Sequence, residues 1–284
     1  MRDLNGHLEL CSINTATLGH QAPIEQVIEA VARAGFGHIA PWRHEIEGNN
    51  IHAIAKQMRD AGLKTNAYCR STYIPANTPA QRQANIADNK RAIADAAILG
   101  ATVFVMVVGS IPPSEKNLAS PRQQVSDAVA ELLPFAKSCG VRIGLEPLHP
   151  VYAADRSCIN LISQALDICQ AIEGHSLDPY LGTVIDCYHV WWDPYLAHSI
   201  ASAGDANRIF GFHVSDWLNP TQDILKDRGL MGDGVIDIKA IRQMIETAGY
   251  AGPIETEIFS AQNWWMRPMA ETLAAVAERL QTCV

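Results

Sequence analysis

Four side chains that can bind a metal ion recur in the second half of the chain, each at or near the end of an apolar, β-branched run. The runs are VRIGLE, LGTVID, RIFGFHV and PIETEIF, and they supply Glu146, Asp186, His213 and Glu257. Three carboxylates and one imidazole form a ligand set for a divalent cation. If the four runs are strands that end at one edge of a sheet, we expect the four side chains to meet at one site.

Each of these residues also has an ordinary structural explanation. Glu146 could pair with a nearby arginine such as Arg142, because a buried carboxylate needs a partner. Asp186 could cap the N-terminus of the next helix. His213 could be a hydrogen-bonded core residue, and Asp216 could orient it or cap the following segment.

Three further polar residues lie close to these runs. Glu255 points to the same side of its strand as Glu257, so periodicity alone does not choose between them. Asp186 and His189 form a D-x-x-H pair that would face one site if the chain turns helical there. Arg228, in the glycine-rich segment RGLMGDGVID, could bind a substrate oxyanion or could be a solvated loop charge.

Tryptophans are concentrated just after three of the apolar runs. They are Trp42, Trp191, Trp192, Trp264 and Trp265. At one face of a barrel they would form an aromatic wall suited to the apolar face of a sugar ring, and we expect Trp42 and Trp265 to contact substrate there. The alternative is that they only pack the surrounding helices.

The elements that must position these residues alternate regularly along the chain. Apolar runs predict eight strands, at 8–13, 37–41, 63–69, 102–108, 141–146, 181–186, 208–214 and 253–259. Amphipathic stretches predict eight helices, at 23–35, 49–62, 79–100, 120–140, 157–172, 193–204, 237–249 and 267–281. This rhythm, without a linker or composition break, predicts an α/β fold: a single (β/α)8 TIM barrel forming one domain over residues 1–284. The first strand is followed by no glycine-rich phosphate loop, which argues against a dinucleotide site.

Composition narrows the partners and the compartment. A net charge of −8 argues against nucleic acid or an anionic membrane as the main partner. No apolar run approaches the roughly 20 residues that span a bilayer. The seven cysteines form no C-x-x-C pair and the N-terminus lacks an apolar signal segment, so we expect reduced, mostly buried thiols in a cytoplasmic protein.

Taken together, the segments GLEPLHP, GTVIDCYHVWW, GFHVSDW, DRGLMGDGVIDI and ETEIFSAQNWW resemble the xylose isomerase-like TIM-barrel sugar isomerases and epimerases, and most closely the inosose (2-keto-myo-inositol) isomerases. The resemblance implies one divalent metal ion held by Glu146, Asp186, His213 and Glu257, and so selects Glu257 over Glu255. It further implies that Glu146 and Glu257 form the acid/base pair. His189 and Arg228 match positions that bind substrate oxygens.

The resemblance leads to a hypothesis of metal-assisted proton transfer on a keto-sugar or keto-cyclitol, through a metal-bound enediolate. Mn²⁺ is the first expectation for the ion, with Mg²⁺, Co²⁺ and Zn²⁺ as alternatives. Only Lys226 and Arg228 are basic in the loop around Arg228, which favours an unphosphorylated substrate. Barrels of this family are often dimers or tetramers, so a homo-oligomer is an open expectation.

Three other functions are alternatives. A lyase or dehydratase on the same scaffold would need a general acid, for which His44, Tyr68 and His149 are candidates. An endonuclease IV-like repair enzyme would need additional zinc ligands, whereas the expected strands 3 and 4 end with Tyr68 and Val108 and the loop reads Asp227-Arg228-Gly229. A non-catalytic sugar-binding barrel would not require three carboxylates.

Overall fold

A parallel β-barrel forms the centre of the structure, a computed structural model that describes residues 1–20 and 22–284. Its strands are β1 (Cys11–Asn14), β2 (His38–Ala40), β3 (Lys64–Thr65), β4 (Ala67–Tyr68), β5 (Val103–Met106), β6 (Arg142–Leu145), β7 (Leu181–Asp186), β8 (Ile209–Val214) and β11 (Ile254–Thr256). The first strand pairs in parallel with both β2 and the last strand, β11, and this pairing joins the two ends of the chain into one barrel.

The barrel has eight strand positions, because β3 and β4 share one. β3 pairs with β2, β4 pairs with β5, and Asn66 lies between the two short strands. The remaining pairs follow the order of the chain. The prediction of a (β/α)8 barrel is therefore confirmed.

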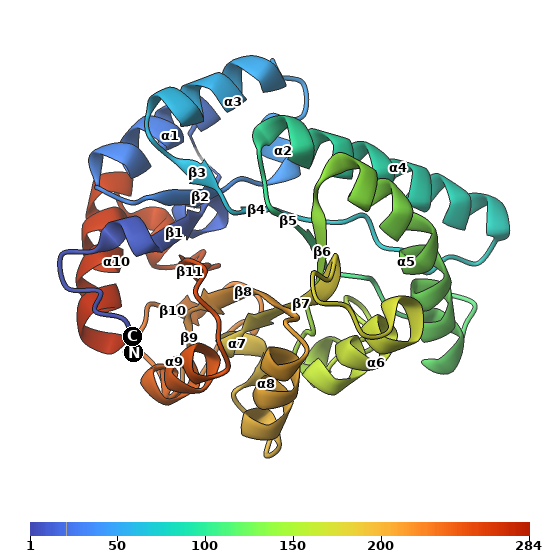
Figure 1. The fold of residues 1–284 in the computed structure, drawn as a ribbon. Helices are drawn as coiled ribbons and strands as arrows, with labels where there is room; N and C mark the ends of the chain where they lie inside the picture. The colour runs from blue at the N-terminus through green and yellow to red at the C-terminus, as the bar shows by residue number, and fades with distance from the viewer. Residues whose placement is uncertain (21) are drawn as a thin grey trace.

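A ring of eight longer helices surrounds the barrel (Figure 1). They are α1 (Ile24–Arg33), α3 (Ile51–Asp60), α4 (Pro79–Leu99), α5 (Ala119–Cys139), α6 (Ile162–Glu173), α8 (Leu196–Asp205), α9 (Ile238–Thr247) and α10 (Met269–Cys283). Two single-turn helices, α2 (Arg43–Ile46) and α7 (Cys187–Val190), follow β2 and β7. The two chain termini lie side by side (Figure 1), where Arg242 donates a hydrogen bond to the carbonyl of Val284.

The expected strand 8–13 is wrong in its first half. Leu8–Leu10 form a 3-10 turn, η1, and the strand begins only at Cys11. Leu8 and Leu10 are apolar because they pack against the core without joining the sheet. The last expected strand is also shorter than predicted: β11 ends at Thr256, which leaves Glu257 directly after it.

Two apolar clusters fill the fold on the two sides of the barrel wall. Along β5, Phe104 and Met106 belong to the large cluster that includes the helices, whereas Val103 and Val105 belong to a small cluster with Val184 of β7. Because successive side chains of a strand point to opposite faces, the small cluster lies inside the barrel. The barrel interior is thus filled with side chains, which separate a site at one end from a site at the other.

Candidate active site

Strand alternation directs the four candidate ligands toward the barrel axis. On β7, Val184 belongs to the interior cluster, so Asp186, two positions later, points the same way. On β8, Phe212 and Val214 belong to the outer cluster, which turns His213 inward. The carboxyl ends of the strands therefore gather polar groups above an apolar interior.

The structure brings Glu146, Asp186, His213 and Glu257 together. Each offers one ligand atom, and these atoms all lie within 4.8 Å of one another. All four side chains are buried, with exposures of 6% or less. The convergence expected from the sequence is found, and it joins the ends of β6, β7, β8 and β11.

Two atoms of this group lack a hydrogen-bond partner among the described residues. Nδ1 of His213 and Oε1 of Glu146 lie 3.1 Å apart, but neither makes a hydrogen bond of good geometry. Buried polar atoms are almost always paired with protein, water or an ion. The unpartnered atoms and the three surrounding carboxylates fit a divalent cation among them.

A fifth buried residue, Glu255, completes the surroundings of His213. Nε2 of His213 lies 3.3 Å from Oε1 of Glu255, on the ring edge opposite Glu146 and Glu257. Metal-binding histidines commonly donate their other ring N–H to a carboxylate, which fixes the tautomer and the ring orientation. Glu255 and Glu257 therefore both face the site, but they lie at different edges of the His213 ring.

Two asparagines hold Glu255. Asn14 Nδ2 donates to Oε1 at 2.8 Å, and Asn66 Nδ2 donates to Oε2 at 2.5 Å. Asn66 is the residue between β3 and β4, and its own Oδ1 accepts a hydrogen bond from Ser12. Sequence reasoning missed these asparagines, because nothing in their spacing relates them to strand β11.

Arg228 lies beside the carboxylates. Its Nη1 donates to Asp186 Oδ2 at 2.9 Å and lies 3.4 Å from Glu257 Oε2, while its guanidinium packs over the rings of Tyr188 and Phe259. A short hairpin of β9 (Asp216–Trp217) and β10 (Arg228–Gly229) carries it inward. It is 3% exposed, so it is not a solvated loop charge.

The D-x-x-H pair does face one site. Asp186 accepts from the backbone N–H of Tyr188 through Oδ1, so it caps helix α7 while Oδ2 contacts Arg228. His189 Nε2 lies 3.3 Å from Arg228 Nη2 and 3.7 Å from Asp186 Oδ2, and its Nδ1 has no hydrogen-bond partner in the described part of the chain. The N-cap explanation of Asp186 therefore holds through Oδ1, while Oδ2 faces the group of possible metal ligands.

Burial and crowding change the acidity of these groups. Burial raises the pKa of Asp186 above its usual value, and Glu257 and Glu146 add to the rise although Arg228 opposes it. Burial lowers the pKa of His189 well below its usual value, and the charge of Arg228 lowers it further. His189 is therefore neutral, with a nitrogen free to accept or donate a hydrogen bond.

The alternative ion pair for Glu146 is not formed. Arg142 lies at the beginning of β6, at the other end of the barrel, and its Nη2 contacts Asp178 at 2.6 Å. Asp216 does not orient His213 either. Its carboxylate accepts four backbone N–H groups, of Trp217, Gly232, Gly234 and Ile236, and so organises the loop after β8.

A narrow cavity of about 30 Å³ lies over the carboxylates. Its lining comprises Trp42, Cys69, Arg70, Val105, Val107, Glu146, Leu148, Tyr152, Arg156, His189, Leu225, Arg228, Glu257 and Phe259. Among the tryptophans, only Trp42 is in this lining. Trp265 packs against Phe259 with ring centroids 5.8 Å apart, one layer behind the cavity. Of the other three, Trp264 is part of the outer core, Trp191 packs against Trp217, and Trp192 packs against His149.

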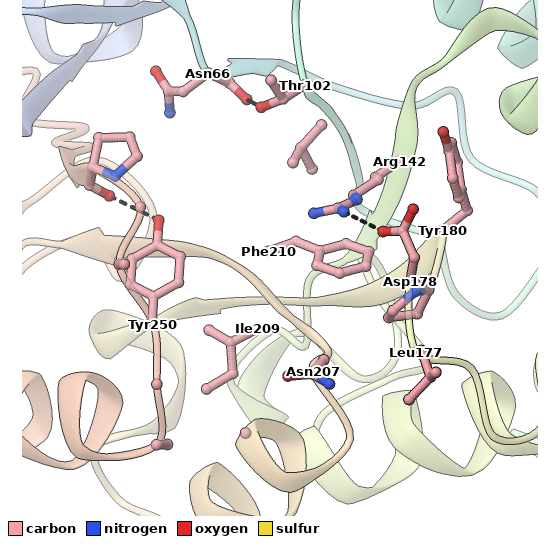
Figure 2. A pocket seen from close by; sticks show the side chains of 18 of the residues that line it. Asn66, Thr102, Arg142, Leu177, Asp178, Tyr180, Asn207, Ile209, Phe210 and Tyr250 are labelled. Atoms are coloured by element: carbon pink, nitrogen blue, oxygen red, sulfur yellow. Dashed lines mark hydrogen bonds and ion pairs between the residues drawn. The ribbon is translucent and has the colours of Figure 1, made fainter.

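A larger cavity, of about 710 Å³, lies at the opposite end of the barrel. Its lining includes Arg142, Ile209 and Pro253, which stand at or just before the beginnings of β6, β8 and β11. Figure 2 shows Asn66 and Thr102 on one side of it and the Arg142–Asp178 pair on another. Its ionic groups are already paired and partly exposed.

A second group of ligand-type side chains lies beside Trp42, after β1 and β2. His20 Nδ1 is 2.8 Å from Glu45 Oε1, and the His44 ring meets the His20 ring edge-on. Glu45 also accepts from Thr15. Three residues are candidate general acids for a lyase: His44, Tyr68 and His149. Among the described residues, the lining of the narrow cavity includes none of them.

The cysteines and the helices agree with the expectations from composition. All seven cysteines are free, and Cys11, Cys69, Cys158, Cys169 and Cys187 are buried. Burial raises the pKa of Cys11 to about 12 and that of Cys158 to about 11, which makes these thiols unreactive. In the described ranges, no helix has both the length and the apolarity needed to cross a bilayer.

The fold is that of a known class of barrel. The chain belongs to the xylose isomerase-like TIM barrel family, whose sequence pattern matches residues 28–283. Among curated proteins, it is 27% identical to an inosose isomerase of Halalkalibacterium halodurans over 160 residues. That match covers 53% of this chain and spans about half the length of the relative, 51%.

Solved structures resemble the whole barrel. Protein SMc04130 of Sinorhizobium meliloti 1021 is 45% identical, with a TM-score of 0.93 over 98% of this chain and 99% of the other. The IolI protein, crystallised with a zinc atom, is 18% identical with a TM-score of 0.80, covering 95% and 96% of the two chains. A D-psicose 3-epimerase is 17% identical with a TM-score of 0.77, again over 95% and 96%.

Proposed function

We propose that this protein is a divalent-metal-dependent isomerase or epimerase of a small keto-sugar or keto-cyclitol. The observation that carries the proposal is the buried group of Glu146, Asp186, His213 and Glu257, whose ligand atoms lie within 4.8 Å of one another beneath a cavity. Family membership and the similarity to an inosose isomerase and a D-psicose 3-epimerase support this substrate class.

The four residues would hold one ion, for which Mn²⁺ is our first expectation, with Mg²⁺, Co²⁺ and Zn²⁺ as alternatives. The unpartnered Nδ1 of His213 and Oε1 of Glu146 support this placement, and so does the zinc atom of the similar IolI barrel. When bound, the ion would polarise a substrate carbonyl and the neighbouring hydroxyl, which acidifies the C–H bond between them.

The protein's own groups would move the proton. Each glutamate carboxylate has two oxygens, so Glu146 and Glu257 can each contact an ion through one and exchange a proton with substrate carbon through the other. One would remove the proton, and the other would return one to the same or the neighbouring carbon. Return to the same carbon gives epimerisation. Return to the neighbouring carbon, together with transfer of the hydroxyl proton to the former carbonyl oxygen, gives isomerisation.

Neutral His189 and the cation Arg228 would bind substrate oxygens. Both line the cavity next to Glu257, and Arg228 is held rigidly by Asp186 and by two aromatic rings. Trp42 would contact the apolar face of the sugar. We assign Trp265 to the same wall, where it would act by supporting Phe259.

The test is proton exchange at carbon. The metal-loaded protein is incubated with keto-sugars and inososes in deuterated water, and NMR follows deuterium entry at carbon. We expect exchange that chelation abolishes, and a loss of about 10²- to 10⁴-fold in Glu146→Gln and in Glu257→Gln. Glu131→Gln, at an exposed ion pair on α5, is the control. Full activity in both cavity variants would refute the assignment.

The same incubation separates the alternative outcome. An isomerase or epimerase yields labelled products of unchanged formula, whereas a lyase or dehydratase loses water or another leaving group, which mass spectrometry detects. Residues 1–284 are taken as one domain, since the family pattern covers 28–283. The cytoplasmic location and the oligomeric state stay predictions.

A further inference from the structure

Two arginines from separate loops line the narrow cavity together with Glu146 and His189. Arg70 directly follows Cys69, at the end of the strand position that β3 and β4 share. Arg156 follows the 3-10 turn η3 (Pro150–Tyr152) in the loop after β6. Arg70 and Arg156 lie 86 positions apart in the chain (156 − 70), and neither belongs to the loop that contains Arg228. The sequence of that loop therefore does not reveal them.

Neither arginine has a carboxylate partner. Within 4.0 Å, no Asp or Glu of residues 1–20 and 22–284 forms an ion pair with Arg70 or Arg156. The fully buried arginines of the same chain behave differently: Arg208 contacts Glu173 at 3.0 Å, and Arg242 contacts Glu246 at 3.0 Å. Glu146 lines the same cavity, but among the described residues neither cavity arginine is neutralised by an ion pair.

Aromatic rings hold both guanidinium groups. Arg70 lies over the ring of Tyr73, 4.7 Å from its centroid, and Arg156 lies over the ring of Tyr152, 5.7 Å from its centroid. A stacked guanidinium keeps its in-plane N–H groups available. Among described partners, the guanidinium of Arg70 makes one weak hydrogen bond, to the carbonyl of Ser71 at 3.3 Å, and the guanidinium of Arg156 makes none.

Two half-buried like charges that line one cavity repel each other. Burial lowers the pKa of Arg70, and the charge of Arg156 lowers it further. Charges away from bulk water normally require a counter-ion. Arg228 does not share this need, because Asp186 and Glu257 already neutralise it.

We infer that Arg70 and Arg156 form a binding site for an anionic substituent of the substrate, a carboxylate or a phosphate ester. This inference rests on the proposed function: the carbonyl end of the substrate would lie at Glu146 and Glu257, and the anionic end would lie against the two guanidiniums. Planar guanidinium groups match the oxygens of either anion. The substrate would thus be a keto-sugar or keto-cyclitol that carries a carboxylate or a phosphate ester.

Space for such a group is available outward from Arg70. A groove of about 570 Å³ shares Arg70 and Trp42 with the narrow cavity. The groove's acidic residues, Glu47 and Asp88, are both paired with Arg43 and so leave Arg70 uncompensated. An anionic chain too long for the narrow cavity could therefore extend past Arg70 toward solvent.

A binding experiment tests the pair without depending on catalysis. Acetate and inorganic phosphate are titrated into the metal-loaded protein by calorimetry, for wild type, Arg70→Gln, Arg156→Gln and the double variant. We expect each single change to weaken one of the two anions about tenfold, because a charge-assisted hydrogen bond is lost. Arg59→Gln, an exposed arginine on α3, is the matched control.

The anion that loses affinity identifies the substituent: acetate for a carboxylate, phosphate for a phosphate ester. Arg70→Lys and Arg156→Lys should retain part of the affinity, which distinguishes loss of charge from misfolding. Equal affinity in the wild type and the double variant would overturn the inference, and so would a wild type that binds neither anion.

A substrate comparison separates this inference from the proposed function. The ratio of kcat/KM for an anionic ketose to that for its neutral counterpart should fall about tenfold or more in each arginine variant. If no metal-loaded form exchanges a proton on any keto-sugar, the proposed function fails while the anion titration still stands. If neutral ketoses turn over and the ratio does not change, the function stands and the anion site is wrong.

Discussion

The two ends of this barrel hold their charged groups in opposite ways. At the amino ends of the strands, a cavity of about 710 Å³ carries the Arg142–Asp178 pair, whose side chains are 43% and 72% exposed (Figure 2). At the carboxyl ends, a cavity of only about 30 Å³ lies over buried carboxylates that face one another. The larger cavity is thus the less reactive one, because its charges are satisfied.

The pKa shifts of the carboxylates differ in direction between the two ends. Glu173, near the amino end of β7, contacts Arg208 and Lys137, and although burial opposes it these partners lower its pKa. Asp186 and Glu255, near the carboxyl ends, have their pKa values raised by burial. One end pairs its charges one to one, whereas the other gathers the carboxylates of Glu146, Asp186, Glu255 and Glu257 around one arginine and one histidine.

The largest difference between the two ends should appear when one aspartate is changed at each. We expect Asp186→Asn to weaken metal binding by more than the roughly 10- to 100-fold that is typical of residues behind the ligands. Asp178→Asn, at the exposed pair, should leave metal affinity unchanged. Calorimetric titration with Mn²⁺ measures both, and similar affinities for the two variants would contradict the assignment of the ends.

Stability should respond in the reverse sense. Glu173→Gln leaves the buried Arg208 without its carboxylate, which should destabilise the fold by about 3 kcal/mol. Denaturant unfolding measures this loss, and the folded fraction should retain normal Mn²⁺ affinity. A fall in metal affinity as large as that of Asp186→Asn would show that the two ends are not separate.

The same carboxylate gives a pH dependence with a defined sign. The folded pKa of Glu173 is lowered, so its contribution is fully present above the unfolded pKa of about 4.3 and is lost as pH falls through the lower folded pKa. Glu173→Gln should therefore reduce the acid sensitivity of the unfolding free energy below about pH 4.3. An unchanged slope in that range would count against the ion pair.

The sequence predicted the convergence of Glu146, Asp186, His213 and Glu257 because strand alternation and strand ends are local properties. Asp186 and His213 could be placed in this way, since each ends or nearly ends a long buried run. Glu255 and Glu257 could not be distinguished by periodicity. The structure pairs Glu255 with His213 across neighbouring strands, while Glu257 stands one layer nearer the mouth, and that depth depends on the register of the closed barrel.

Residues that reach the site from distant loops could not be predicted. Asn66 holds Glu255 only because the third strand position is split around it, and Arg70 and Arg156 meet only through the fold. Trp42 was placed correctly beside the cavity, whereas the position of Trp265 behind Phe259 depends on side-chain packing. Such contacts have no period in the sequence.

Glu255 contacts His213 of the candidate metal site and Asn66, which lines the larger cavity at the other end. Its substitution should therefore weaken metal binding less than Asp186→Asn does. Glu255→Gln keeps the shape but removes the charge beside Nε2 of His213, and we expect Mn²⁺ affinity to fall about 10- to 100-fold. The unfolding free energy should change less than in Glu173→Gln, because the amide oxygen can still accept a hydrogen bond from Asn14 or Asn66 and no buried arginine loses its carboxylate. Metal affinity equal to that of the wild type would exclude a role for Glu255 in orienting His213.

The smallest effect should come from Asn66, which both lines the larger cavity and donates to Glu255. Asn66→Ala removes one of two hydrogen bonds on that carboxylate, a loss of about 1 kcal/mol, so Mn²⁺ affinity should fall by about three- to tenfold. Thr102→Val is the matched control, because Thr102 lines the same cavity and bonds only the backbone carbonyl of Asn66. If both variants weaken Mn²⁺ binding equally, the effect comes from packing around the cavity. If only Asn66→Ala weakens it, the contacts from Asn66 through Glu255 to His213 connect the two ends.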